Sequence, residues 1–265
     1  MGEWDSPLGN AMKSMWTRWA MVAACVLAAS GCATPPDGKT PGRDLGAHVW
    51  VPADQGLAGR GGAVAWEHFK LPGKTPVEFR YVRMDGRDAL QAKSSSAASM
   101  MRHPVHIEPD QLGAVRFSWK VPELIADADL AVRDKADSPV RLVLAFDGDR
   151  SRFSPRDAAL SELANMVTGE PMPYATLMYV WCNVRQPGSV IRSPRTDRIR
   201  KLVVESGPRN LNRWLDYQRD IRADFERAFG EPPGALIGIA VMTDSDNTHT
   251  ETRAWYGQAT LLARP

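Results

Sequence analysis

The pattern of apolar and polar positions is most distinctive between Gly234 and Thr248, where the sequence reads GALIGIAVMTDSDNT. The segment Leu236–Thr243 carries no charge and is rich in Ile, Ala and Val, which predicts a strand buried on both faces. It is followed at once by Asp-Ser-Asp-Asn at residues 244–247, where the chain must leave the sheet. We therefore expect this acidic tail to bring its oxygen atoms to one rim of the domain.

Alternating apolar and polar residues predict further strands on both sides of this segment. The clearest example is residues 115–121, and the other expected strands cover residues 66–71, 77–84, 87–93, 140–146, 176–184, 199–205 and 253–263. Helical spacing occurs at residues 157–167 and at residues 213–229, the second with Asn212 as its N-cap. The pattern predicts a mainly all-β fold, an antiparallel jelly-roll-like β-sandwich with two short peripheral helices.

The N-terminal region has the features of an export signal. Lys13 and Arg18 precede the apolar segment Trp19–Ala29, which is shorter than the roughly 20 residues needed to span a bilayer. The next residues complete Ala-Ser-Gly-Cys at 29–32, which resembles the lipobox of bacterial lipoproteins and favours Cys32 as the lipidated residue. We expect a lipoprotein signal peptide at 1–31 and a lipid anchor at the periplasmic face of the cell envelope, in the outer membrane. Cleavage and release of a soluble protein is the alternative.

The composition of the remaining residues predicts how the rest of the chain is organised. Residues 32–62 are rich in Pro and Gly and predict a tether, and residues 63–265 form the predicted β-sandwich domain. The net charge of +2 gives no reason to expect nucleic-acid binding. After the predicted signal peptide and Cys32, Cys182 is the one remaining cysteine in the sequence, so no internal disulfide is expected. The apolar residues around Cys182 predict a buried thiol.

The acidic tail is the main candidate site. Asp244, Asp246 and Asn247 offer the hard oxygen ligands that calcium prefers. An EF-hand is excluded, because the sixth position of such a loop would be His249 and the twelfth Trp255. One alternative is that Asp244, Asp246 and Asn247 contact a ligand directly. Another is that Asp244 and Asn247 form hydrogen bonds with their own backbone and shape a turn.

Residues near this tail are candidates for two further roles. Trp255 and Tyr256 are consecutive in the last predicted strand and point to opposite faces, so one of them is a candidate for contact with a ligand. A glycosidase would need two carboxyl groups about 5 to 9.5 Å apart, for which Asp244, Asp246 and Glu205 are the candidates. No phosphate-binding glycine loop or G-x-S-x-G nucleophile motif is present, which argues against the common enzyme classes.

Several motifs occur together in an order typical of one family. Phe-Ser-Trp-Lys-Val at 117–121, Arg141, Tyr-Val-Trp at 179–181 and Met-Thr-Asp-Ser-Asp-Asn-Thr at 242–248 resemble an uncharacterised family of exported bacterial proteins, domain of unknown function 3047, over residues 66–262. The resemblance implies a fold similar to the jelly rolls of carbohydrate-binding modules, and it implies no activity. The family's paired acids before the strand Arg are reduced here to Asp137, and Gln258 replaces an acid, which weakens any metal site borrowed from the family.

Three functions are compatible with these observations. The first is a cell-envelope lipoprotein whose β-sandwich binds a glycan or another envelope component without catalysis. The second is a calcium-stabilised hydrolase of envelope glycans, and the third is a structural or assembly lipoprotein without a small ligand. A deep cleft with two convergent carboxyl groups would favour the second, and a shallow aromatic face the first.

Overall fold

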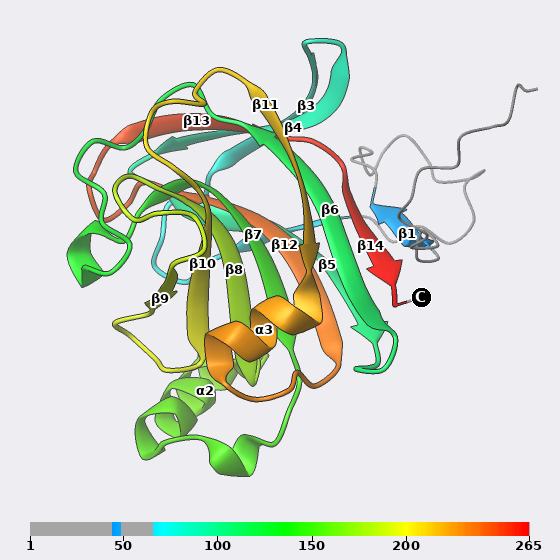
Figure 1. Ribbon diagram of the computed structural model, residues 1–265. Coiled ribbons are helices and arrows are strands. Elements are labelled where there is room, and N and C mark those ends of the chain that lie inside the picture. Colours follow the sequence, from blue (N-terminus) through cyan, green and yellow to red (C-terminus); the bar gives the residue numbers. More distant parts are fainter. Residues whose placement is uncertain (1–43, 49–65, 265) are drawn as a thin grey trace, which may run out of the picture. The chain divides into compact units, whose positions relative to one another are not determined.

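The computed structural model describes residues 44–48 and 66–264 (Figure 1). The predicted signal peptide, Cys32 and most of the predicted tether lie outside the described residues. The described residues all belong to one unit, Pro41–Pro265. No helix within the described ranges is long and apolar enough to cross a membrane.

Two β-sheets make up the fold, and each has seven strands within the described residues. Sheet A consists of β1 (Asp44–His48), β3 (Glu78–Met84), β4 (Arg87–Ser95), β6 (Leu112–Lys120), β11 (Trp214–Asp220), β13 (Glu251–Tyr256) and β14 (Ala259–Ala263). Sheet B consists, in spatial order, of β2 (Glu67–Lys70), β5 (Ala98–Ile107), β12 (Leu236–Asp244), β7 (Ser138–Phe146), β8 (Ala175–Cys182), β10 (Ile199–Ser206) and β9 (Val190–Arg192). These two sheets confirm the predicted mainly all-β fold, and almost every pairing of strands is antiparallel.

The core lies between the two sheets. Phe117 from β6 stacks on Tyr179 from β8, with ring centroids 5.6 Å apart. Trp119, Trp181 and Tyr256 are almost completely buried in the same cluster. Because side chains alternate between the two faces of a strand, the residues in between point to the outer face of each sheet.

The uncharged segment near the C-terminus is a central strand, as predicted. It forms β12 and lies between β5 and β7, with its acidic end at Asp244 paired with Ser138 of β7. The neighbouring strand β5 was not predicted, because Pro104 interrupts its apolar pattern. Pro104 lies opposite Gly238, next to an irregularity in the pairing of β5 and β12, where a residue without an N–H is tolerated.

The predicted helix over residues 213–229 is wrong in its first half. Trp214–Asp220 is the edge strand β11, which pairs along its length with β6, and only Ile221–Phe229 is helical, as α3. The N-cap is Asp220, whose side chain accepts a hydrogen bond from the backbone N–H of Ala223. Trp214 and Tyr217 fit a helical stripe by spacing, but Tyr217 packs on Phe117 across the β6–β11 pair, and this packing decides the strand.

Three other differences affect the positions of side chains. The predicted last strand is divided at Gly257 and Gln258 into β13 and β14, both of which pair with β6. The pair β8–β10 is parallel rather than antiparallel. The strand β1 lies inside the segment predicted as a tether and pairs with β14.

The two helices lie at the same end of the sheets (Figure 1). The first, α2 (Pro155–Thr168), has Ser154 as its N-cap and Gly169 with φ +77° after its last turn, close to the predicted bounds. It follows β7 and precedes β8, whereas α3 directly precedes β12. The acidic end of β12 is therefore at the opposite end of sheet B.

Candidate functional site

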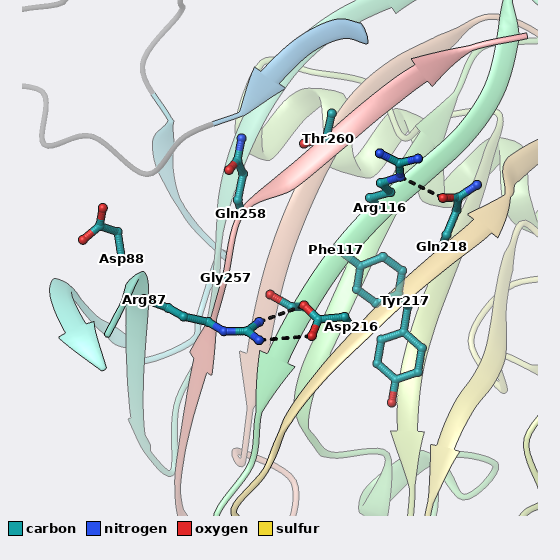
Figure 2. Close-up of a pocket in the computed structure, with 11 residues that line it drawn as sticks. Arg87, Asp88, Arg116, Phe117, Asp216, Tyr217, Gln218, Gly257, Gln258 and Thr260 are labelled. Carbon is teal, nitrogen blue, oxygen red and sulfur yellow. Dashed lines mark hydrogen bonds and ion pairs between the residues drawn. The ribbon is translucent and has the colours of Figure 1, made fainter. Parts of the chain in front are cut away.

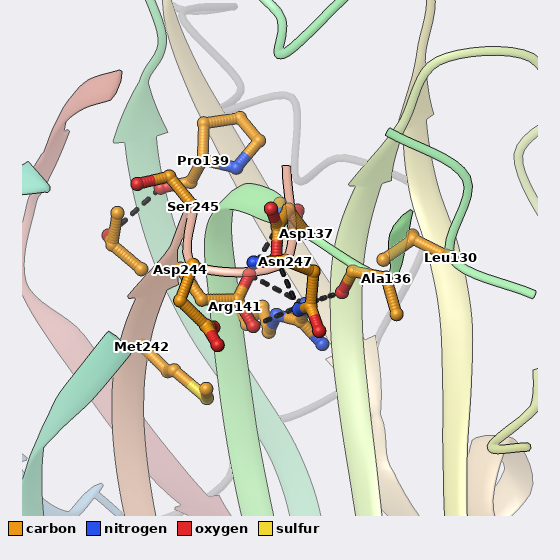
Figure 3. Close-up of polar contacts among 12 residues, drawn as sticks. Leu130, Ala136, Asp137, Pro139, Arg141, Met242, Asp244, Ser245 and Asn247 are labelled. Atoms are coloured by element: carbon orange, nitrogen blue, oxygen red, sulfur yellow. Dashed lines mark hydrogen bonds and ion pairs between the residues drawn. The ribbon is translucent and has the colours of Figure 1, made fainter. Parts of the chain in front are cut away.

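The acidic tail begins with a buried ion pair. Arg141 of β7 donates two hydrogen bonds, of 2.7 and 2.8 Å, to the carboxylate of Asp244 at the end of β12 (Figure 3). Asp244 also accepts the backbone N–H of Ser138 at 2.7 Å. Only 4% of the Arg141 side chain and 7% of the Asp244 side chain are exposed. Burial raises the pKa of Asp244, an effect that Arg141 opposes.

A second carboxylate organises the turn after β12. Asp137 accepts hydrogen bonds from the backbone N–H and the side chain of Asn247, and from the backbone N–H and hydroxyl of Thr248. Burial by itself would raise the pKa of Asp137, but these donors outweigh it and hold the pKa below its ordinary value. The turn is therefore held by an acid from a distant part of the chain, rather than only by the tail's own side chains.

The other tail residues also have partners. Asp246 forms an ion pair with Lys74, and the Asn247 side-chain oxygen accepts a hydrogen bond from Arg195 at 3.2 Å. Asp137, Asp244 and Asp246 converge so that one oxygen from each lies within 4.8 Å of the others. This acidic triad has the donor type that calcium prefers, although Arg141, Lys74 and the N–H groups already occupy its oxygens. The residues therefore fit a cation poorly.

The aromatic candidates are buried. The hydroxyl of Tyr256 donates to the Met242 carbonyl at 2.6 Å and lies 2.8 Å from the Thr243 hydroxyl. Trp255, on the opposite face of β13, is 7% exposed and lies below the ammonium group of Lys120, 5.9 Å from it. Tyr256 thus joins sheet A to β12 through the core.

Two strands of sheet B separate Glu205 from the tail. It lies at the same end of the sheet as Asp244, but on β10, and β7 and β8 lie between β10 and β12. Three strand spacings place the two backbones about 14 Å apart. Glu205 accepts hydrogen bonds from Tyr217 at 3.1 Å and Asn210 at 3.3 Å.

The outer face of sheet B contains a groove that the sequence pattern does not predict. Its volume is about 720 Å³, and it lies between the outer face of the central strands and α2. Small residues occupy its centre, where Gly238, Ala240 and Ala145 come from the adjacent strands β12 and β7. Met100 and Met178 belong to the floor around them, and Leu163 and Val167 of α2 form a wall.

One ionic group lies at this groove. The guanidinium of Arg102 donates to both carboxylate oxygens of Glu170, at 2.6 and 2.8 Å, and to Glu67 at 3.1 Å. It also lies over the ring of Phe69, 4.3 Å from the centroid. The hydrogen bonds from Arg102 lower the pKa of Glu170. The pattern along β2 or β5 contains no sign of this group, because its members come from β2, from β5 and from the loop after α2 and meet only in the folded chain.

A second, more polar groove of about 620 Å³ lies on sheet A between β6, β11 and the β13–β14 break (Figure 2). Arg87 forms two hydrogen bonds with Asp216, at 2.8 and 3.2 Å, and Arg116 donates to Gln218 at 2.7 Å. The Arg87 guanidinium lies 5.2 Å from the centroid of the Trp214 ring. Gln258, Thr260 and Ser118 supply further polar atoms to the groove.

The family follows from a direct match of the sequence. The model of the family described as "Protein of unknown function (DUF3047)" matches residues 64–260. The chain belongs to this family. The match covers β2 to β13 and both grooves. No curated protein matches the chain.

Some solved structures are similar to this chain. One similar structure is the xyloglucanase domain of NopAA, a type three effector from Sinorhizobium fredii, in complex with cellobiose, with 10% identity over 75% of this chain and 93% of that chain and a TM-score of 0.38. Another is the low-affinity xylan-binding module CBM86 from Roseburia intestinalis, with 14% identity over 76% of this chain and 97% of that chain and a TM-score of 0.27. At these TM-scores neither structure bears on the ligand or activity of this chain.

Proposed function

We propose that the chain is an exported, lipid-anchored protein of the cell envelope whose β-sandwich binds a ligand without catalysis, in the groove on the outer face of sheet B. The observation that carries this proposal is the groove itself. Its volume of about 720 Å³ lies in the range of small-molecule sites, roughly 300 to 1,000 Å³. A largely apolar lining with a few convergent polar groups is also typical of such sites.

The charged groups of the groove support binding rather than hydrolysis. A glycosidase requires one carboxyl group with a raised pKa to act as a general acid. Glu170 has the opposite property, because its hydrogen bonds from Arg102 lower its pKa. The acids Asp244 and Asp246, which the hydrolase hypothesis requires, are not among the residues that line either groove.

The location in the envelope rests on the N-terminal sequence. The basic and apolar segments before Cys32 have the organisation of a lipoprotein signal, and two or more acyl chains hold a protein stably on a membrane. A protein anchored in this way meets other envelope components at high local concentration. We therefore propose that the ligand is such a component, and that the protein faces the periplasm from the outer membrane.

Binding can be tested with the fluorescent apolar probe 1-aminoanthracene and the full-length protein. We expect saturable fluorescence enhancement in the wild type and its loss in Ala240→Phe, because Ala240 lies at the centre of the groove and the larger ring fills it. Val184→Phe is the matched control, since Val184 is 72% exposed and lines neither groove. Equal enhancement in wild type and Ala240→Phe would overturn the assignment of the groove.

A glycan is the second candidate ligand, and the polar groove of sheet A supports it. Planar side chains of Arg, Asp and Gln on one face offer donors and acceptors for sugar hydroxyl groups (Figure 2). The ring of Trp214 lies beside Arg87. A glycan array would test this, with Arg116→Ala to weaken retention and the exposed Arg83→Ala as its control. If neither groove retains a ligand, the structural or assembly role becomes the better hypothesis.

A calcium-stabilised form has one observation in its favour, the convergence of Asp137, Asp244 and Asp246 within 4.8 Å. The same carboxylates are bound by Arg141, by Lys74 and by backbone N–H groups. Calcium would have to displace two cations to reach its usual six to eight oxygen ligands. The proposed function therefore requires no calcium, and chelation tests this.

A further inference from the structure

The chemical class of the ligand can be derived from the lining of the sheet B groove, and this inference rests on the proposed function of that groove. The cross-strand register places outer-face residues in rows that run across the strands. One row reads Glu67, Arg102, Ala240, Val143, Met178 and Lys201, from β2 to β10. The ionic group is thus at one end of the row and an uncharged stretch of three residues lies next to it.

The depth of the groove follows from residue size. The next row contains Gly238 opposite Ala145, so the smallest side chains of β12 and β7 lie together at the centre of the face. A Cβ added at Gly238 would lie 3.7 Å from the Ala145 Cβ, which is ordinary contact with no clash. The centre of the groove is therefore hollow because side chains are small there, rather than because the backbone separates.

The apolar surface around this hollow suits an aliphatic chain. Methionines at 100 and 178 and aliphatic residues of α2 surround it, and flexible thioether side chains adapt to varied apolar shapes. Leu163 and Val167 remain 52% and 57% exposed, so the wall offers apolar area that a bound chain would cover. The aromatic rings among the described lining residues are those of Phe69, which the Arg102 guanidinium covers, and of His103, which is 7% exposed. A sugar ring would find no open stacking platform there.

The ionic end of the groove has an excess of acid. Arg102 is the cation of the group, and its hydrogen bonds go to Glu67 and Glu170, which leaves one formal negative charge. The Glu67 side chain is 61% exposed and the Glu170 side chain 56% exposed, so their remaining acceptor positions face the groove opening or solvent. A negatively charged head group would meet two carboxylates at this end, whereas a cationic head or one with hydroxyl donors would be attracted.

We propose that the groove binds a single-chain aliphatic amphiphile whose head group carries no negative charge. The chain lies over Ala240, Val143 and Met178, and the head lies beside Glu67 and Glu170.

A head-group series at constant chain length tests the charge. The full-length protein is titrated with decyltrimethylammonium, decyl maltoside and decyl sulfate below their micellar concentrations, and each is measured by displacement of 1-aminoanthracene. We expect the first two to displace the probe and decyl sulfate to be at least about tenfold weaker, because the net charge of the ionic group is negative. Equal or tighter binding of the sulfate would overturn the proposal.

A chain-length series tests the aliphatic part. From hexyl to decyl maltoside, affinity should rise about fourfold per methylene while the added carbons are buried, as expected from about 0.8 kcal/mol for each buried CH₂. The same rise in Ala240→Phe would place the chain elsewhere and overturn the proposal. A flat series in the wild type would do so as well.

Two variants separate the head-group effect from folding. Glu67→Gln together with Glu170→Gln leaves Arg102 unbalanced, and we expect the preference against decyl sulfate to fall about tenfold while maltoside binding is kept. Glu123→Gln, outside the groove, is the control and should preserve the preference. An unchanged preference in the double variant would refute the role of these acids.

The failure of this inference is distinguishable from failure of the proposed function. If 1-aminoanthracene binds and Ala240→Phe abolishes it, but the head-group order is reversed, the groove is a ligand site and the ligand class is wrong. If the probe never binds and sedimentation shows self-association that Ala240→Phe abolishes, a second copy covers the groove and both proposals fail.

Discussion

Arg141 and Asp244 form a buried ion pair across neighbouring strands, with two hydrogen bonds of 2.7 and 2.8 Å. The pair joins the start of β7 to the end of β12, the central strand that the apolar run predicted. Its atoms are almost completely excluded from solvent, so each charge depends on the other. The acidic tail is therefore tied into the framework of sheet B.

Removing one member of this pair should destabilise the fold strongly. Asp244→Ala leaves the Arg141 guanidinium buried without its carboxylate, and such a loss costs about 3 to 5 kcal/mol. Urea denaturation measures the change. The exposed pair Arg83–Asp88 provides the control, and Asp88→Ala should cost less than about 1 kcal/mol. The double variant Arg141→Met, Asp244→Leu should recover most of the stability, and a cost equal to the sum of the single changes would contradict this account.

Lys201 should make stability depend on pH. It is 4% exposed, donates to the Leu130 carbonyl at 2.7 Å, and burial lowers its pKa to about 7. Arg141 lowers the pKa further, whereas Asp244 opposes this. Between the folded value and the ordinary value of 10.5 the unfolded chain binds the additional proton, so stability should rise as the pH increases from about 7.

The variant Lys201→Met should flatten this rise, measured by urea denaturation from about pH 7 to 9.5. The upper limit keeps the pH below the range in which tyrosines ionise in the unfolded chain. Burial raises the pKa of Tyr179 in the folded protein, so at higher pH its ionisation would favour unfolding. Lys93→Met, at an exposed position, should leave the slope unchanged. A slope that persists in Lys201→Met would assign the effect to other groups.

Chelation should leave the melting temperature unchanged. Arg141 and Lys74 already form ion pairs with Asp244 and Asp246, and Asp137 accepts hydrogen bonds from Asn247 and Thr248, so calcium has no stabilising role to lose. We expect equal melting temperatures in EDTA and in calcium at millimolar concentration. A calcium-dependent increase of more than about 2 °C that Asp246→Ala abolished would establish linked metal binding and restore the calcium hypothesis.

The lipid anchor is predicted to depend on one cysteine. When the chain is expressed with its own leader in a bacterial host, we expect palmitate incorporation and recovery in the membrane fraction, both lost in Cys32→Ser. Cys25→Ser is the control, because the apolar segment before Cys25 is too short for a signal. Labelling that follows Cys25 instead would place the cleavage site there, and no labelling would favour release of a soluble protein.

The limits of the sequence are clearest at residues 213–229. Trp214, Tyr217, Ile221 and Phe225 recur at helical intervals, yet the first two belong to β11 and the last two to α3. The periodicity of one segment carries no information about its partner strand. Pairing with β6 makes the first half of this segment a strand. The sequence could not predict that β8 and β10 pair in parallel for the same reason. The apolar pattern of each strand is the same whichever way the strand runs.

By itself the sequence determined the mainly β composition, the central position of β12 and the bounds of α2, because these follow from local patterns of burial and capping. It also placed the acidic tail at a rim. Only the tertiary structure decided that Asp244 faces Arg141, that Asp137 holds the turn, and that Gly238, Ala240 and Ala145 open a groove. These outcomes depend on which strands are neighbours and in which register, and such long-range pairing leaves no mark in the order of residues within a single strand.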